Sequence, residues 1–243
     1  MGQQLLSHQS VSSQWLANQS ATSTLPLLDL SLLSGSDTER QAFLTALRHA
    51  ARDVGFFYLT GHGIDTSLLR QIQILSRQFF ALSDEEKLSI AMIRSPHFRG
   101  YNRAASEFTR GQPDWREQFD IGAERTPLPQ IAGAPSWTRL QGPNQWPTAL
   151  PELKPVLLQW QEEMTRMSLR LLRAFALALD LDEQAFDALY GDKPNEHIKL
   201  IRYPGREATQ SGQGVGAHKD SGFLSFLLQD TQRGLQVEVE EGQ

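Results

Sequence analysis

The stretch GVGAHKDSG, residues 214–222, sets a histidine and an aspartate two positions apart inside a glycine-rich run. Alternate side chains of a β-strand point to the same face, so a strand here would project His218 and Asp220 together and turn Lys219 away. An imidazole nitrogen beside a carboxylate oxygen can occupy two adjacent coordination positions of one ion. The stretch therefore predicts a metal-binding pair. A plainer interpretation stays open, in which His218 only hydrogen-bonds Asp220 near a turn.

The rest of the composition limits which metal such a pair could hold. The chain has no cysteine, which excludes disulfides, thiolate zinc sites and cysteine nucleophiles. Histidine, carboxylate and main-chain oxygen ligands suit iron(II), manganese or a similar ion. A second histidine beside the pair would complete the two-histidine, one-carboxylate face of non-haem iron(II) oxygenases, with three positions free for substrates and oxygen.

Charge and hydropathy exclude several classes of partner. The 243 residues carry a net charge of -5, so the chain lacks the basic footprint that nucleic acid or anionic lipid requires. The N-terminal stretch has neither the basic nor the apolar region of a secretory signal, and we find no apolar run long enough for a membrane span. We therefore expect a cytoplasmic protein with a small-molecule substrate, and the sequence implies no protein partner.

Hydrophobic periodicity divides the chain into three parts. Residues 1–24 are polar and aperiodic, which predicts a disordered leader. Residues 25–150 form an N-terminal region of helices and strands whose later part, 93–150, is rich in glycine and proline and predicts loops and edge strands. Residues 151–243 begin with a long amphipathic helix and continue as strands. The elements expected are strands at 25–31 and 54–63, a helix from Ser36 or Asp37 to about Asp53, a helix through Leu68–Phe79, a short helix capped by Ser83 with Glu86, and a short helix near 182–190.

The last third of the chain predicts a sheet. Four short runs of β-forming residues follow one another at about ten-residue intervals: 197–205, 214–222, 223–230 and 234–242. Strands grouped after helices predict an α+β protein with a mainly β core, a sandwich or barrel backed by the earlier helices. Because the chain stops within this series, we expect the β core to be incomplete at the C-terminus.

Several stretches together resemble the iron(II)- and 2-oxoglutarate-dependent dioxygenases of the isopenicillin N synthase-like family. The run LIRYPG, GVGAHKDSGFLSFLLQD and GLQV matches that family's pattern in its catalytic region. Upstream stretches match in the same order, namely LPLLDLS, GFFYLTGHGI, FFALSDEEK, RGY and PDWREQFDIG. The resemblance covers residues 25–243.

This resemblance implies a fold and a reaction. Its members fold as a double-stranded β-helix, a jelly roll, backed by helices. They couple oxidative decarboxylation of 2-oxoglutarate by dioxygen to oxidation of a small molecule, with iron(II) as the metal. Its pattern makes His218 and Asp220 iron ligands and places a third histidine and an Arg-x-Ser pair further on, where fewer residues remain than the pattern needs.

The same resemblance suggests further site residues. Tyr203, in the RYP stretch, matches a position that often faces the co-substrate, with plain packing as the alternative. Arg99 and Tyr101, in FRGY, lie in an expected pocket-lining loop and are predicted to contact the substrate; a surface salt bridge is the alternative for Arg99. Earlier histidines such as His62 and His197 favour structural roles over iron binding.

Three other functions stay open. An oxidase of the same fold could act without 2-oxoglutarate, as isopenicillin N synthase does. A chain without the third ligand could be a non-catalytic remnant. A cupin-type sandwich also carries inward-facing histidines, but it usually begins with a His-x-His pair that this sequence lacks.

Overall fold

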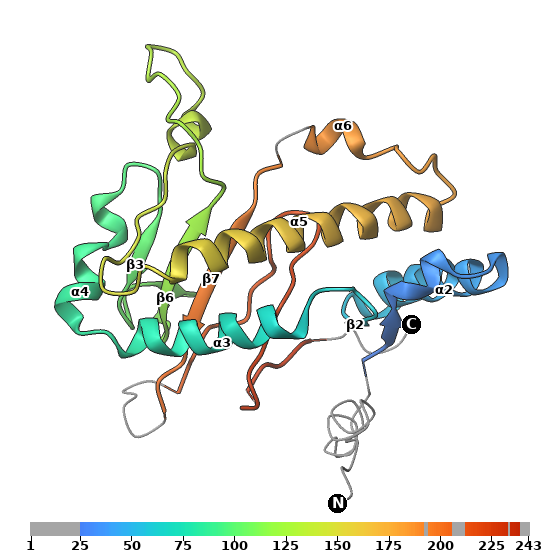
Figure 1. Ribbon diagram of the computed structural model, residues 1–243, viewed down its shortest axis with the longest axis horizontal. Coiled ribbons are helices and arrows are strands. Elements are labelled where there is room, and N and C mark those ends of the chain that lie inside the picture. Colours follow the sequence, from blue (N-terminus) through green and yellow to red (C-terminus); the bar gives the residue numbers. More distant parts are fainter. Residues whose placement is uncertain (1–24, 192–193, 206–211, 233, 239–243) are drawn as a thin grey trace, which may run out of the picture. The chain divides into compact units, whose positions relative to one another are not determined.

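The computed structural model describes residues 25–191, 194–205, 212–232 and 234–238 (Figure 1). The leader predicted at 1–24 lies outside these described residues. The described residues form two compact units, one made of 25–62, 177–180 and 235–238, the other of 63–176 and 181–234.

The first unit is built around a short parallel strand pair. Strand β1 (Leu27–Asp29) pairs with β2 (Tyr58–Thr60), and a 3-10 helix, Leu30–Ser34, follows β1. Helix α2 (Asp37–His49) begins at Ser36, whose side chain accepts the Glu39 N–H while Glu39 reaches back to the Ser36 N–H. This reciprocal capping satisfies two amides that a helix start leaves without partners. The helix continues as a π-turn, Ala50–Val54, and ends at Gly55.

Two helices of the second unit follow the periodicity that predicted them. Helix α3 (Thr66–Ala81) buries its apolar stripe, which includes Leu68, Ile72 and Phe79. Helix α4 (Asp84–Ser89) starts at the predicted Ser83–Glu86 capping box. Both predictions are confirmed because each depends on residues no more than four positions apart.

The long predicted helix is α5 (Leu153–Ala178). Leu153, Leu157 and Leu171 of its stripe are fully buried, as core positions should be. Of the short helix expected near 182–190, only α6 (Asp187–Tyr190) is α-helical. No helix of the described residues combines the length and hydropathy that crossing a membrane would take.

The main sheet of the second unit has three antiparallel strands in the order β3-β6-β7. These are β3 (Gly100–Asn102), β6 (Glu117–Gly122) and β7 (His197–Arg202). The prediction of edge strands within 93–150 is wrong for β6, which is the central strand and is buried at all six positions. Its partners arrive from distant parts of the chain, which is why local sequence could not reveal its place. A separate hairpin pairs β4 (Phe108–Thr109) with β5 (Gln112–Pro113).

The register of the sheet separates an apolar face from a polar one. Tyr101, Phe119 and Leu200 are directly opposed across the strands and share one face. Phe79 of α3 packs on this face, with its ring centroid 4.7 Å from that of Phe119 and 6.1 Å from that of Tyr101. The other face carries polar side chains from the same strands, namely Asn102, Gln118, Asp120, Lys199 and His197.

The strands predicted over 214–222, 223–230 and 234–242 are not formed in the described part of those runs. A strand needs a neighbouring strand for its backbone groups. Here polar groups make local or side-chain contacts instead: the His218 ring bonds the carbonyl of Gly216, two residues back, and the Gln232 N–H donates to the Asp230 side chain. The described part of these runs is therefore coil without strand pairing.

Candidate metal centre and its polar surroundings

The predicted pair, His218 and Asp220, is on one side of its segment. His218 Nε2 lies 3.3 Å from Asp220 Oδ1, and both side chains are about half exposed. The two groups point the same way, as expected, although the backbone is a loop without strand pairing. Among the described residues, no group of three histidine, aspartate or glutamate side chains is close enough to hold a metal.

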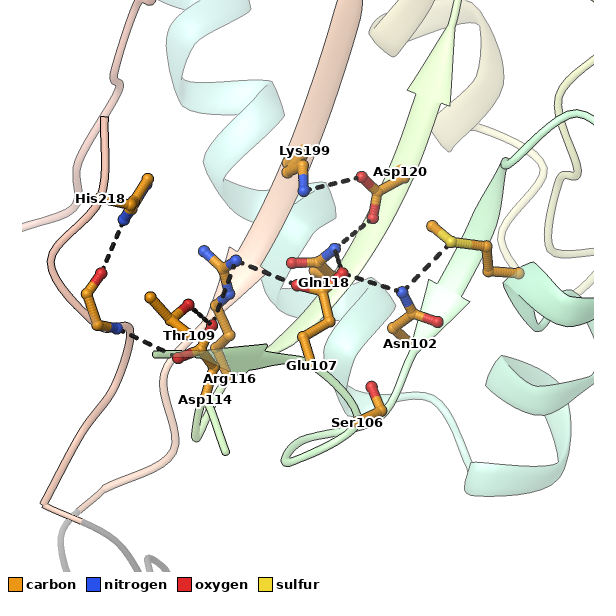
Figure 2. A network of polar contacts seen from close by, with 12 residues as sticks. Asn102, Ser106, Glu107, Thr109, Asp114, Arg116, Gln118, Asp120, Lys199 and His218 are labelled. Atoms are coloured by element: carbon orange, nitrogen blue, oxygen red, sulfur yellow. Dashed lines mark hydrogen bonds and ion pairs between the residues drawn. The ribbon is translucent and has the colours of Figure 1, made fainter. Parts of the chain in front are cut away.

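The imidazole of His218 is oriented by its own backbone. Its Nδ1 lies 2.8 Å from the carbonyl oxygen of Gly216 (Figure 2). A carbonyl oxygen can only accept, so Nδ1 must carry the proton and Nε2 is left to accept or to bind a metal. A metal-ligating histidine commonly has this arrangement, with one nitrogen donating to a carbonyl and the other facing the metal.

This geometry fits a cation between the two side chains. In the neutral imidazole, the Nε2 lone pair and a carboxylate oxygen would face each other as two acceptors. A proton on Nε2 or a positive ion held by both would make the contact favourable. One nitrogen and one carboxylate oxygen are donors that iron(II) accepts.

The polar face of the sheet continues toward this pair as a network (Figure 2). Asp120 is fully buried, and its carboxylate accepts from Gln118 Nε2 at 2.8 Å and bonds His197 Nε2 at 2.8 Å. Lys199 Nζ forms an ion pair with the same carboxylate at 3.4 Å. Gln118 Nε2 also donates to Glu107 Oε1 at 2.8 Å. His197 is thus a partner of Asp120, in keeping with the structural role favoured by the sequence.

Tyr203 lies beside this network. A methyl group at Gly214 would come within 2.9 Å of its ring, so the ring packs closely on the backbone four residues before His218. It is half exposed and neighbours Arg116. Burial acts to lower the pKa of Arg116, but contacts with Tyr203 and Glu107 outweigh it and raise that pKa. The co-substrate role of Tyr203 stays a prediction.

Arg99 is buried and already has acceptors in the protein. Its Nη1 donates to the carbonyls of His97 at 3.0 Å and Phe98 at 3.1 Å, and its Nη2 donates to the carbonyl of Leu140 at 3.2 Å. Burial lowers the pKa of its guanidinium, with Asp120 opposing that change. The substrate contact predicted for Arg99 stays a prediction, and it would require Arg99 to exchange these partners.

Tyr101 is buried on the apolar face, away from the polar network. Its hydroxyl donates to Glu117 Oε2 at 2.5 Å, and Lys87 Nζ is 3.1 Å from the same oxygen. Burial, and then the Glu117 carboxylate, raise the pKa of the Tyr101 phenol. The substrate contact predicted for Tyr101 stays a prediction, and its partner in the structure is the buried carboxylate of Glu117.

Replacing Tyr101 with phenylalanine is expected to lower the free energy of unfolding at pH 7 by about 1–3 kcal/mol, because Glu117 loses a buried donor. A raised phenol pKa stabilises the folded state fully below the unfolded pKa of about 10, and that stabilisation is lost as the pH rises above it. The wild-type protein should therefore lose stability above about pH 10 more steeply than Y101F. Urea unfolding at several pH values measures both effects, and parallel alkaline curves would contradict the assignment.

Sequence reasoning missed Asp114, Glu107 and Asp120. One sign was available: in the stretch PDWREQFDIG the polar residues Asp114, Arg116, Gln118 and Asp120 recur at every second position. This is the period of one strand face, so they belong together on a polar surface.

Comparisons with known proteins now decide the family. The profile described as "non-haem dioxygenase in morphine synthesis N-terminal" matches residues 25–149. The homoarginine-6-hydroxylase 2-ODD-C23.1 of Arabidopsis thaliana is 34% identical over 228 residues, which are 88% of this chain and 68% of that protein. The chain belongs to the iron(II)- and 2-oxoglutarate-dependent dioxygenases of the isopenicillin N synthase-like type. The resemblance found in the sequence is confirmed.

Other relatives of this dioxygenase chain agree. The 2-oxoglutarate-dependent dioxygenase frbJ of Dothideomycetidae sp. is 40% identical over 225 residues, 90% of this chain and 60% of that protein. Among solved structures, a full-length Neurospora crassa protein in complex with alpha-KG and 5-formyluracil is similar with a TM-score of 0.59 and 26% identity, covering 74% of this chain and 52% of that one. The chain thus spans about 60% of the length of frbJ and about half of the Neurospora crassa protein.

Proposed function

We propose that this chain contributes the first two iron ligands of a non-haem iron(II) oxygenase that couples oxidative decarboxylation of 2-oxoglutarate to oxidation of a small molecule. The single observation that carries the proposal is the His218–Asp220 pair, with Nε2 and Oδ1 3.3 Å apart and Nδ1 already donating to Gly216. Family membership supports the same reaction. The named relatives include homoarginine hydroxylases, and the similar Neurospora crassa protein was also solved with alpha-KG alone.

The fold proposed for the site is a double-stranded β-helix to which residues 151–243 contribute the first part and which residues 25–150 support. The antiparallel sheet β3-β6-β7, with one face apolar and one polar, is compatible with one wall of such a barrel. The boundaries of these two regions, the incompleteness of the β core and the cytoplasmic location stay predictions from the sequence.

Iron(II) with 2-oxoglutarate supplies the activation of dioxygen, which no protein side chain can perform. The chain's own residues would bind and orient. His218 offers Nε2 in a fixed tautomer, and Asp220 offers a negative oxygen that offsets the charge of the metal. We expect Tyr203, whose ring packs on Gly214, to border the co-substrate, as its match to the family pattern suggests.

The test is an anaerobic titration of the 243-residue chain with iron(II), followed by calorimetry with and without 2-oxoglutarate. We expect micromolar iron(II) binding that 2-oxoglutarate strengthens. Iron(II) binding unaffected by 2-oxoglutarate would favour an oxidase that does not use it. No binding at micromolar iron(II) would mean that this chain alone is a non-catalytic remnant.

A further inference from the structure

A buried carboxylate outside the predicted ligand set holds the segment that carries His218. Asp114 follows strand β5 and is 1% exposed. Its Oδ2 accepts from Thr109 Oγ1 at 2.7 Å, and Arg116 Nη2 lies 3.8 Å from the same oxygen. Its Oδ1 accepts from Gln213 Nε2 at 2.9 Å and from the backbone N–H of Gly216 at 3.2 Å. A buried carboxylate is stable only when it is paired and hydrogen-bonded in this way.

A backbone hydrogen bond also joins the segment of Asp114 to the segment that carries His218. The N–H of Trp115 donates to the carbonyl of Gln213 at 3.0 Å. A methyl group at Gly216 would lie 2.7 Å from Cγ2 of Thr109, closer than atoms in proteins approach. A side chain at residue 216 would therefore displace Thr109, which itself donates to Asp114.

Gly216 joins Asp114 to the imidazole. Its N–H donates to the Asp114 carboxylate, and its carbonyl accepts from Nδ1 of His218 at 2.8 Å. Figure 2 shows this chain of contacts running from Thr109 and Asp114 to His218. Asp114 lies about a hundred positions before His218, so the connection fixes the histidine against the β4–β5 hairpin and not only against its own loop.

We propose that Asp114 is a positioning residue of the iron site. It holds the Gly216 peptide so that the Gly216 carbonyl keeps His218 in the Nδ1–H tautomer, with Nε2 turned toward Asp220. The role of Asp114 in iron binding rests on the proposed function. The positioning itself concerns the protein without metal and can be tested there.

Three variants of the full chain separate positioning from general stability. Asp114→Ala removes both acceptor oxygens. Asp114→Asn keeps one carbonyl oxygen for Gly216 and offers its amide to Thr109, so it should rescue the geometry. Asn144→Ala is the matched control, because the buried Asn144 side chain also bonds the backbone of a glycine, Gly122, at 2.9 Å and 2.8 Å. The control lacks any described link to His218.

The first readout is made on metal-free protein labelled with nitrogen-15. We expect wild type, Asp114→Asn and Asn144→Ala to show His218 as the Nδ1–H tautomer at a pH where it is neutral. In Asp114→Ala the tautomer should become mixed. The Gly216 amide should exchange about 10- to 100-fold faster, since a hydrogen bond to a charged group changes an equilibrium by roughly that factor. Circular dichroism establishes that each variant is folded.

The second readout is the affinity for manganese(II), a redox-inert probe of the iron site. Loss of a residue that orients a metal ligand typically weakens binding about 10- to 100-fold, which is the change expected for Asp114→Ala and not for Asn144→Ala. Unchanged tautomer and amide exchange in a folded Asp114→Ala would overturn the inference, as would failure of a folded Asp114→Asn to restore them. If wild type binds no manganese(II) or iron(II), the proposed function fails, while the tautomer comparison still decides the role of Asp114.

Discussion

Alanine in place of Asp220 is expected to weaken iron(II) binding by at least about 100-fold, more than the loss of a residue that only orients a ligand. The variant keeps the His218 imidazole but loses the carboxylate oxygen 3.3 Å from it. Because the Asp220 side chain is half exposed and makes no buried contact with another described segment, the free energy of unfolding without metal should change by no more than about 0.5 kcal/mol. This variant should therefore lose iron(II) affinity while its free energy of unfolding stays nearly unchanged.

Lys219→Ala is the matched control for that experiment. Lys219 lies between the two proposed ligands and is exposed, so its replacement perturbs the same loop without removing a proposed donor atom. Anaerobic calorimetry with iron(II) and urea unfolding of the metal-free chains give the two quantities. Wild-type affinity in Asp220→Ala, or an equal loss in Lys219→Ala, would show that the pair does not hold the metal.

Alanine at Glu117 is expected to cost about 3–5 kcal/mol of unfolding free energy, a large part of the roughly 5–15 kcal/mol typical of a domain. Glu117 Oε2 is bonded to Lys87 and Tyr101, and its Oε1 accepts from Arg202 Nη1 at 2.7 Å. Arg202 is half exposed and can turn to water, but the buried Lys87 would lose its closer carboxylate and keep only the ion pair with the exposed Asp84, whose Oδ1 lies 3.6 Å from Nζ. That buried ammonium accounts for most of the cost.

A double variant tests this explanation. Lys87→Met with Glu117→Leu removes both charges and fills similar volume, so it should recover part of the stability lost in Glu117→Ala, while the buried Tyr101 hydroxyl still lacks the Glu117 acceptor. Urea unfolding of Lys87→Met, Glu117→Leu and the double variant gives the coupling energy between the two positions. If the loss of unfolding free energy in the double variant equals the sum of the losses in the two single variants, the cost comes from packing and not from the buried charge of Lys87.

The contrast between α4 and β6 shows what the sequence could predict. The helix start at Ser36, one of two predicted caps, the Ser83–Glu86 capping box and the stripe of α5 depend on residues close in sequence, and all three are confirmed. Strand β6 is placed by β3 on one side and by β7, about eighty residues away, on the other. Propensity and periodicity do not indicate which distant strands will pair, so the central position of β6 was missed.

The candidate site divides in the same way. The pairing of His218 with Asp220 follows from their spacing and was predicted, although the backbone that achieves it is a loop. The part played by Asp114 arises from a contact across about a hundred residues, to which no local pattern points. The partners of Arg99 and Tyr101 were also hidden, because the Leu140 carbonyl and the Glu117 carboxylate that they bond lie 41 and 16 residues away.

Strand β6 also bears on how this protein can diverge over generations. All six of its positions are buried, and three of its side chains, those of Glu117, Gln118 and Asp120, meet partners from other strands, helices or loops. A single substitution at such a position is destabilising, since it leaves a neighbouring side chain without its hydrogen-bond or ion-pair partner. Inherited change in β6 should therefore come as paired replacements, such as position 117 together with 87, while the exposed loop around Lys219 can drift one residue at a time.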